Sequence, residues 1–370
     1  MLSNNPAFFS GSYAPEDITF LLRRTVIALT PVALKERYLQ DGRRHYSEML
    51  SEERPPAPDH MAVYKAALRE HRRRLARETL ALASAIAAES RVGEPLGLVS
   101  LVRAGCPLGV LLRRALCLLG WDVRHYGVSI IRDRGIDHAA LSLVERECRP
   151  ENIYFVDGWT GKGAISGELS RSLAGRDGYD ARQPRLAVLA DLCGGSRLSA
   201  SHEDWLIPFG LLGAPVAGLI SRSLWADDGL HRCMVWESLR EADQSRDFVD
   251  TVSALWTPDM VAASRARPAA VSDAARAECG RRSAELVRRI MREYGVDTPN
   301  RIKPGIAEAT RALLRRVPDI VLVHRLNDPD VRLLLSLARR QGVRTEEVGA
   351  AIRPYKAVTI IRRIANPRRP

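Results

Sequence analysis

Short runs of apolar residues, each followed by a glycine-containing turn and a segment with helical spacing, recur through the middle of the chain. The clearest runs cover residues 96–102, 153–156 and 185–191 and contain mainly aliphatic and β-branched side chains. Continuous apolar runs of this length are typical of strands buried on both faces of a parallel sheet. The pattern predicts an α/β core in which ligands bind at the carboxyl ends of the strands.

The N-terminal third has a different pattern, in which apolar and charged positions alternate at helical period. We expect helices over residues 17–27 and 61–90, separated by the turn-rich segment ERPPAPDH. The basic run HRRRLAR within the second segment is typical of a solvated helix face.

Charge divides the chain more sharply than hydropathy does. Residues 1–260 contain 32 Lys and Arg against 33 Asp and Glu, whereas residues 261–370 contain 24 against 11. A chain of 370 residues exceeds one ordinary core, so at least two domains are expected. We predict a helical N-terminal region at 1–92, an α/β core at 93–258, a connector rich in Ala, Ser and Arg at 259–283, and a basic domain at 284–370.

Six cysteines are scattered along the chain without a CxxC pair or a nearby His at zinc spacing. This usage argues against structural zinc and suits a reducing compartment. The N-terminus lacks the charged start and apolar core of a signal peptide, and the longest apolar run, near residue 209, is too short to span a bilayer. We expect a cytoplasmic protein with no membrane partner.

The most informative stretch is IYFVDGWTGKGA at residues 153–164. Its apolar start predicts a buried strand that ends at Asp157, and its glycines let backbone N–H groups close around an anion. A helix predicted over 165–173 would direct its positive end to the same place. A plain strand-to-helix corner gives the same pattern. The candidate phosphate-binding residues are Gly158, Thr160, Gly161, Lys162 and Gly163.

A second turn of this kind follows the strand at 96–102. Gly105 and Gly109 would permit close backbone approach, and the Arg103 guanidinium suits bidentate contact with a diphosphate. Further along, Arg132 and Arg134 follow the apolar run at 123–131 and could close over a substrate. Plain turns and exposed arginines at a strand end are the alternatives.

The strand predicted at 185–191 ends at Asp191, and an acidic cluster follows beside Trp205. Asp204 in this cluster could hold a planar acceptor through its carboxylate, next to the stacking surface of the indole. A helix N-cap with an acidic first turn explains residues 201–204 equally well.

The loop at 157–163 resembles the phosphoribosyl-pyrophosphate loop of type I phosphoribosyltransferases, and the turn at 103–109 resembles their pyrophosphate loop. Two departures are visible: Gly158 stands where the family usually has a second acid, and Trp159 stands where it has a common catalytic acid. The order of these segments, with FFSGSYAPEDITFLL, EDWLIP and EADQSRDFVD, is similar to one bacterial family over about residues 8–255. It is the StiP-like phosphoribosyltransferase family of tellurite-resistance (Ter) stress operons, some members of which carry the label cysteine protease.

This resemblance implies a type I phosphoribosyltransferase-like parallel sheet with a helical hood. It also implies phosphoribosyl transfer from phosphoribosyl pyrophosphate to an unknown acceptor, in the making of a nucleoside-like metabolite linked to stress. Arg103 and Asp157 would be the catalytic residues, and Mg²⁺ would bind at Asp157 with the diphosphate. Lys35, Arg43, Arg44, His45 and Tyr46 could contribute to the hood.

The basic C-terminal part has its own order of elements, with helices predicted at 303–316 and 328–343 and strands at 319–325 and 355–364. This compact α/β sandwich resembles the Pelota-type RNA-binding domain over about residues 284–366. The resemblance implies RNA contact through Lys303, Gly305, Glu308 and Arg311, with Ala307 where the family motif has Asn.

Two other function classes stay open. A cysteine hydrolase would use Cys106 or Cys193 as nucleophile and His125, His138 or His202 as base. A non-catalytic RNA-binding regulator would retain an inactive core, which the missing second acid favours.

Overall fold

A seven-stranded sheet forms the centre of the larger of two units in the computed structural model, which describes residues 2, 5–266 and 272–363. Its strand order is β1-β4-β3-β6-β7-β8, all parallel, with β5 antiparallel to β4. The strands are β1 (Thr19–Phe20), β3 (Leu96–Val102), β4 (Val123–Ile131), β5 (Gly135–Ile136), β6 (Ile153–Thr160), β7 (Leu186–Asp191) and β8 (Leu198–Ser201).

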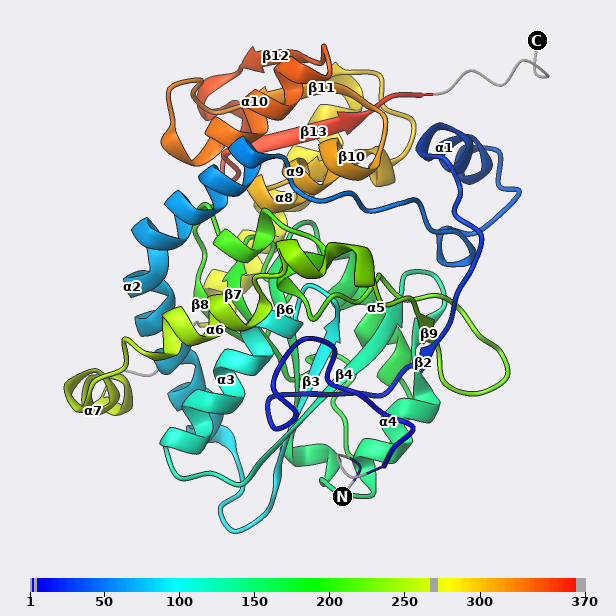
Figure 1. Cartoon of the computed structure of the whole chain (residues 1–370). Helices are drawn as coiled ribbons and strands as arrows, with labels where there is room; N and C mark the ends of the chain where they lie inside the picture. The colour runs from blue at the N-terminus through cyan, green and yellow to red at the C-terminus, as the bar shows by residue number, and fades with distance from the viewer. Residues whose placement is uncertain (1, 3–4, 267–271, 364–370) are drawn as a thin grey trace.

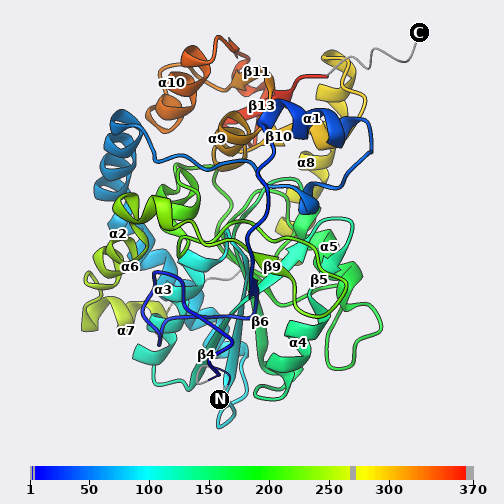
Figure 2. The same ribbon diagram turned by 45° about the vertical axis from the view of Figure 1, so that its right-hand side comes forward.

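Helices cover both faces of this sheet (Figures 1 and 2). On one face α3 packs against α2 and α6, with α7 beside α2, and on the other α4 and α5 pack near β4. Successive side chains of β3 enter opposite cores, Leu98 on the first face and Val99 on the second. This two-sided burial explains the unbroken apolar runs. The helices are α2 (Pro58–Glu89), α3 (Cys106–Leu118), α4 (His138–Glu145), α5 (Ala164–Leu173), α6 (Ser245–Ser253) and α7 (Pro258–Ala266).

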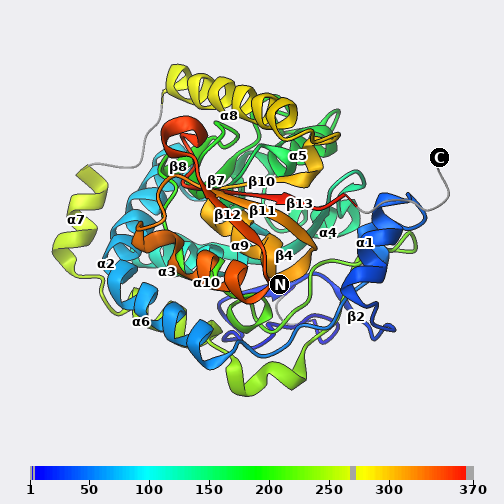
Figure 3. The same ribbon diagram turned by 90° about the horizontal axis from the view of Figure 1, so that it is seen from above.

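The smaller unit contains a four-stranded mixed sheet in the order β10-β13-β11-β12. Helices α9 and α10 cover one face and α8 lies along the other, as the view in Figure 3 makes clear. The elements are α8 (Asp273–Glu293), β10 (Ile302–Pro304), α9 (Ile306–Arg315), β11 (Pro318–Val323), α10 (Arg332–Arg340), β12 (Arg344–Glu347) and β13 (Ala357–Ile361). The predicted fold, a parallel α/β sheet with a smaller α/β sandwich, is therefore confirmed.

The limits proposed for the domains stay predictions, and part of the predicted connector, residues 267–271, lies outside the described residues. No helix in the part of the chain that the structure describes has the length and apolar character needed to cross a bilayer.

The helix predicted over 17–27 was wrong, because this segment forms two short strands. β1 extends the parallel sheet beside β4, and β2 (Arg23–Arg24) pairs with β9 (Arg232–Cys233). The fully buried Phe20 ring lies against Gly127 of β4, where a Cβ atom would come within 2.3 Å of the ring. Burial at the sheet edge thus outweighs the local helical pattern. Before α2, the described residues contain the α-helix α1 (Val32–Gln40) and a short 3-10 helix at Tyr46–Glu48.

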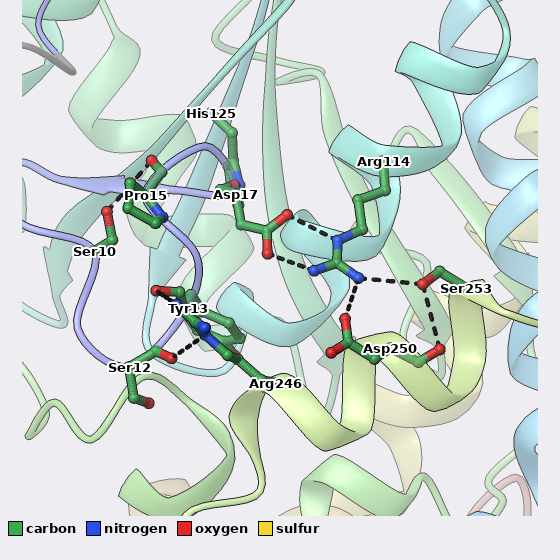
Figure 4. Close-up of polar contacts among 10 residues, drawn as sticks. All are labelled: Ser10, Ser12, Tyr13, Pro15, Asp17, Arg114, His125, Arg246, Asp250 and Ser253. Carbon is green, nitrogen blue, oxygen red and sulfur yellow. Dashed lines mark hydrogen bonds and ion pairs between the residues drawn. The ribbon is translucent and has the colours of Figure 1, made fainter.

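An ion-pair network fastens this N-terminal segment to the helices (Figure 4). The Arg114 guanidinium of α3 donates to both carboxylate oxygens of Asp17, at 2.8 and 2.6 Å, and to Asp250 of α6 at 2.6 Å. The Asp17 carbonyl oxygen lies 2.7 Å from His125 Nδ1 of β4. Because Asp17 is 1% exposed, its charge is compensated only through this bidentate contact.

One buried carboxylate, that of Asp204, joins the two units. It follows β8 and accepts hydrogen bonds from the backbone N–H of Ile306, at 3.0 Å, and of Lys356, at 2.8 Å. Ile306 is the first residue of α9, so the core supplies a cap for a helix of the other unit. The helix that the alternative interpretation placed after residue 201 is absent, and Asp204 instead caps a helix about a hundred residues further along the chain. Burial raises the pKa of Asp204 to about 6.

We expect the Asp204→Ala variant to lose about 3 kcal/mol of unfolding free energy, because two buried N–H groups lose their acceptor. Chemical denaturation measures this loss, with Glu203→Ala as the matched control since the Glu203 side chain is 72% exposed.

The folded pKa of Asp204 lies above the ordinary value of 3.8, so the folded state holds the proton more tightly. The stability of the wild type relative to Asp204→Asn should therefore fall as pH rises from about 4 to 6. A flat difference would contradict the assignment.

Candidate functional site

A cavity of about 1360 Å³ lies where the carboxyl ends of the central strands meet the smaller unit. The end of β6 and the start of α5 form its floor, β10 and α9 form one wall, and α1 with the following loop contributes at the side. Figure 1 places the smaller unit directly over this end of the sheet. The cavity is therefore built jointly by segments that are far apart in the sequence.

The glycine segment at 153–164 begins as predicted, but its strand continues three residues further, to Thr160. The Thr160 hydroxyl donates to Asp191 at 2.5 Å and accepts from the backbone N–H of Leu192 at 3.0 Å. The Gly161 carbonyl accepts from the Tyr355 hydroxyl at 2.7 Å. These groups are thus committed to internal contacts, and Gly163, with φ of 84°, starts α5.

Asp191 ends β7 but is fully buried. Besides Thr160, its carboxylate accepts from Gly195 N–H at 3.0 Å and from the backbone and hydroxyl of Ser196 at 2.9 and 2.8 Å. This network closes the turn after β7, and no carboxylate oxygen is left for a ligand.

Arg103 lies away from the cavity. Its guanidinium pairs with Glu53 and donates to the Ile220 carbonyl at 2.6 Å, and the residue is 5% exposed. Gly105 permits close packing, since a Cβ there would lie 2.0 Å from the Val156 carbonyl oxygen. Gly109 has the same role beside Ser100, where its Cβ would lie 2.0 Å from the hydroxyl. This turn packs helix against sheet.

Asp157 lines the cavity floor and is 9% exposed. Burial raises its pKa to about 7, while the Gly158 N–H at 2.8 Å and the nearby Arg311 favour the charged form. Trp159 beside it is almost buried and lies under the Arg311 guanidinium, 4.5 Å from the ring centroid. The two units thus meet through an arginine on an aromatic face.

Lys162 and Arg132 also line the cavity, whereas Arg134 pairs with Glu48 outside it. The Lys162 ammonium donates to the carbonyl oxygens of Pro299 and Ile302, the latter at 2.9 Å. Burial lowers its pKa to about 6, and the neighbouring cations add to this effect.

The residues of the C-terminal motif face the core rather than open solvent. Lys303, Glu308 and Arg311 line the same cavity, and Gly305, with φ of 90°, lies against Leu192. The tertiary structure thus brings the two predicted sites, one for phosphate and one for RNA, around a single space.

The sequence patterns did not indicate five of the arginines that line the cavity, which are Arg222, Arg301, Arg315, Arg316 and Arg363. Arg315 follows Glu308 and Arg311 at helical spacing, so an α9 face could have been inferred from it, and Arg316 is adjacent. Arg222 comes from an irregular segment that carries no comparable signal. Of the proposed hood residues, Lys35, Arg44, His45 and Tyr46 reach the cavity.

The thiols are mostly inaccessible. Cys106 is 0% exposed and burial raises its pKa well above the ordinary value, and burial raises that of Cys193 to about 12. His125 is committed to Ser100 and Asp17, and burial lowers its pKa to about 4. Among the described residues, Cys279 Sγ lies 3.9 Å from His202 Nδ1. The sequence patterns did not pair these two residues.

Metal ligands do not gather in the residues described: no group of three or more His, Cys, Asp or Glu is placed to hold an ion. The expected Mg²⁺ at Asp157 depended on a diphosphate substrate and stays an untested prediction.

Fold and site together define a two-unit α/β protein with a strongly basic cavity at the junction of the units. The family model described as tellurite-like stress resistance cysteine protease StiP matches residues 11–253, and the PELOTA RNA binding domain model matches residues 281–363. The "Cysteine protease StiP" of Acinetobacter baylyi (strain ATCC 33305 / BD413 / ADP1) is 43% identical over 374 residues, covering 96% of this chain and 95% of that protein. This chain belongs to the StiP family, and the predicted membership is confirmed.

The predicted phosphoribosyltransferase activity was wrong, since both the family model and the relative carry the name of a cysteine protease. A solved hypoxanthine phosphoribosyltransferase from Trypanosoma cruzi, bound to IMP, is similar at 15% identity with a TM-score of 0.27, covering 46% of this chain and 84% of that one. That likeness is too slight to carry an argument. The expected use of phosphoribosyl pyrophosphate is withdrawn together with the transferase activity.

The buried pair of Glu53 and Arg103 generates a stability prediction. Glu53→Gln leaves the Arg103 guanidinium without a counter-charge, so we expect a loss of about 3 kcal/mol in unfolding free energy. The Arg103 guanidinium lowers the pKa of Glu53 to about 2 against the penalty of burial, so its contribution should be present above pH 4.5 and disappear as pH falls toward 2. Asp228→Asn at the exposed pair with Arg23 is the control and should cost less than about 1 kcal/mol. Equal losses in the two variants would contradict the prediction.

Proposed function

We propose that this chain is a thiol-dependent peptidase. The observation that carries the proposal is the 43% identical relative named as a cysteine protease, which aligns along almost the whole chain. In a thiol peptidase, a thiolate attacks the carbonyl carbon of the scissile amide, the amine leaves with a proton from a histidine, and water then hydrolyses the thioester. A reducing, cytoplasmic compartment would keep such a thiol active.

Cys279 and His202 are the candidate nucleophile and base, because a thiol and an imidazole must lie within reach of each other. Cys279 on α8 is partly exposed, unlike Cys106 and Cys193. His202 Nδ1 also lies 2.7 Å from the Asp191 carbonyl oxygen. For Nδ1 to accept the thiol proton, its own proton must move to Nε2 and the contact with the carbonyl must open.

Peptidase activity should depend on Cys279 and rise with pH. Burial, with the nearby Asp191 carboxylate, raises the pKa of Cys279 above its ordinary value, so the thiolate fraction grows as pH increases above neutrality. We expect Cys279→Ser and His202→Ala to lower hydrolysis of labelled casein at least about a hundredfold. Cys117→Ser is the matched control, since Cys117 is exposed and lies on α3.

The possible outcomes distinguish the proposed peptidase class from the proposed catalytic pair. An inactive wild type under reducing conditions would count against the peptidase itself. Activity that survives both Cys279→Ser and His202→Ala would leave the class standing and reject this pair, with Cys193→Ser as the next variant to assay.

A second candidate function is RNA binding by the smaller unit. It is supported by the match of residues 281–363 to the PELOTA RNA binding domain and by the excess of basic residues after 260. Exposed arginines such as Arg281 and Arg282 on α8 supply charge at the surface, with side chains 69% and 65% exposed.

RNA affinity should fall steeply with salt if this candidate is right. Binding of a fluorescent single-stranded RNA, followed by anisotropy, should give a linear plot of log K against log salt, with a slope of about −0.7 for each phosphate contact. The Arg281→Ala and Arg282→Ala double variant should flatten this slope, whereas Arg23→Ala on the larger unit should not. A slope near zero would remove RNA as a partner.

A further inference from the structure

The cavity between the units carries a large excess of positive charge. Eleven Lys and Arg residues line it against five Asp and Glu residues. Most lining carboxylates are already used: Asp297 pairs with Arg301 at 2.8 Å and Asp133 with Arg132 at 3.1 Å. The remaining cations are therefore under-compensated.

Three of these cations form no ion pair closer than 4.0 Å with the described residues, although the Glu308 carboxylate lies near all three. The Lys303 ammonium and the Arg311 guanidinium form no hydrogen bond or ion pair with any residue that the structure describes, and Arg311 Nε is buried without an acceptor. The nearest carboxylate oxygen to Arg315 is that of Glu53, at 4.0 Å, and Glu53 already pairs with Arg103. Buried polar groups without partners are costly, so an empty cavity of this kind is unfavourable.

Burial and neighbouring positive charges lower the pKa values of several cations that line the cavity. Burial lowers the pKa of Lys303 to about 8, with Arg316 and Arg132 adding to the effect and Glu308 and Glu36 opposing it. Lys162 faces Lys303, Arg132, Glu308 and Arg316, and burial with these neighbours lowers its pKa to about 6. Burial likewise lowers the pKa of Arg315 to about 9, with Arg103 and Arg311 nearby. An anion bound in the cavity would raise the pKa values of these cations again.

We infer that this cavity is a binding site for a ligand with more than one phosphate group, held at the same time by Lys162 and Arg132 of the core and by Lys303, Arg311 and Arg315 of the smaller unit. Guanidinium groups match phosphate oxygens in pairs, and both units contribute cations to the lining. A volume of about 1360 Å³ is larger than a single phosphate needs. The inference rests on the charge of the cavity and on neither proposed function.

Two sources of this chemistry exist, a small polyphosphate and the phosphate backbone of RNA. Isothermal titration of the full chain with inorganic pyrophosphate, and separately with a short single-stranded RNA, distinguishes them. For whichever probe binds, Lys303→Ala and Arg315→Ala should weaken binding about ten- to hundredfold, because each removes a charged hydrogen-bond donor. Arg23→Ala is the matched control, since it removes an equal charge from an exposed ion pair on the larger unit.

Binding should also take up protons near neutral pH. An anion raises the pKa of Lys162 and Lys303, so the bound state holds protons that the free state has partly released. Titrations in two buffers of different ionisation enthalpy measure this uptake, and Lys162→Met should reduce it. Binding of anions to exposed arginines alone would show no uptake at this pH.

The outcomes are distinct. Pyrophosphate binding that depends on Lys303 supports the site with a small ligand, and RNA binding with the same dependence supports it with RNA as the source. No binding of either probe overturns the inference, as does binding that Lys303→Ala and Arg315→Ala weaken no more than Arg23→Ala does. Thermal unfolding of each variant checks that it folds, and Arg132→Ala, at a half-buried side chain on the core wall, repeats the test without altering α9.

Discussion

The buried carboxylate of Asp204 determines how the two units of this protein meet. It accepts the backbone N–H of Ile306, at the start of α9, and that of Lys356, just before β13, so one side chain fixes a helix and a strand of the smaller unit against the end of β8. A carboxylate at a helix N-terminus is favoured by the exposed N–H groups there, which offsets part of the cost of burying its charge. Because α9 is held in this position, its charged face closes over the carboxyl end of β6 and the cavity forms between them.

The same contact explains why the predicted RNA-binding face does not stand free. Glu308 and Arg311 lie on the side of α9 that faces the core, where Arg311 packs on Trp159. The indole therefore serves as a packing surface between the units. An anion can reach these residues only by entering the joint cavity or after the two units separate. The arginines on α8 face solvent and are accessible without either step.

Two kinds of buried charge coexist here, and their contrast is informative. Arg114 with Asp17, and Thr160 with Asp191, form networks in which the protein supplies the partners of the buried carboxylate. Such networks hold turns and helices in place, and their polar atoms have no hydrogen-bonding capacity left for a ligand. Lys303 and Arg315 are half-buried without such partners, and burial together with the neighbouring arginines lowers the pKa of each. The thiol chemistry that we propose would have a different location, at the contact of Cys279 on α8 with His202.

The sequence by itself determined the elements whose burial is complete. The apolar runs at β3, β6 and β7 and the periodic stretch of α2 were predictable because their pattern depends only on the two faces of a buried strand or the single face of a helix. Local pattern failed at residues 17–27, because pairing with the edge strand β4 overrides a helical signal, and at Asp204, whose capping partner lies about a hundred residues further on. It also could not tell a ligand-binding glycine turn from one that packs against its own sheet, as at Gly105, or separate a paired arginine from an unpaired one. Those distinctions depend on which distant groups arrive at the same place, and only the tertiary structure decides that.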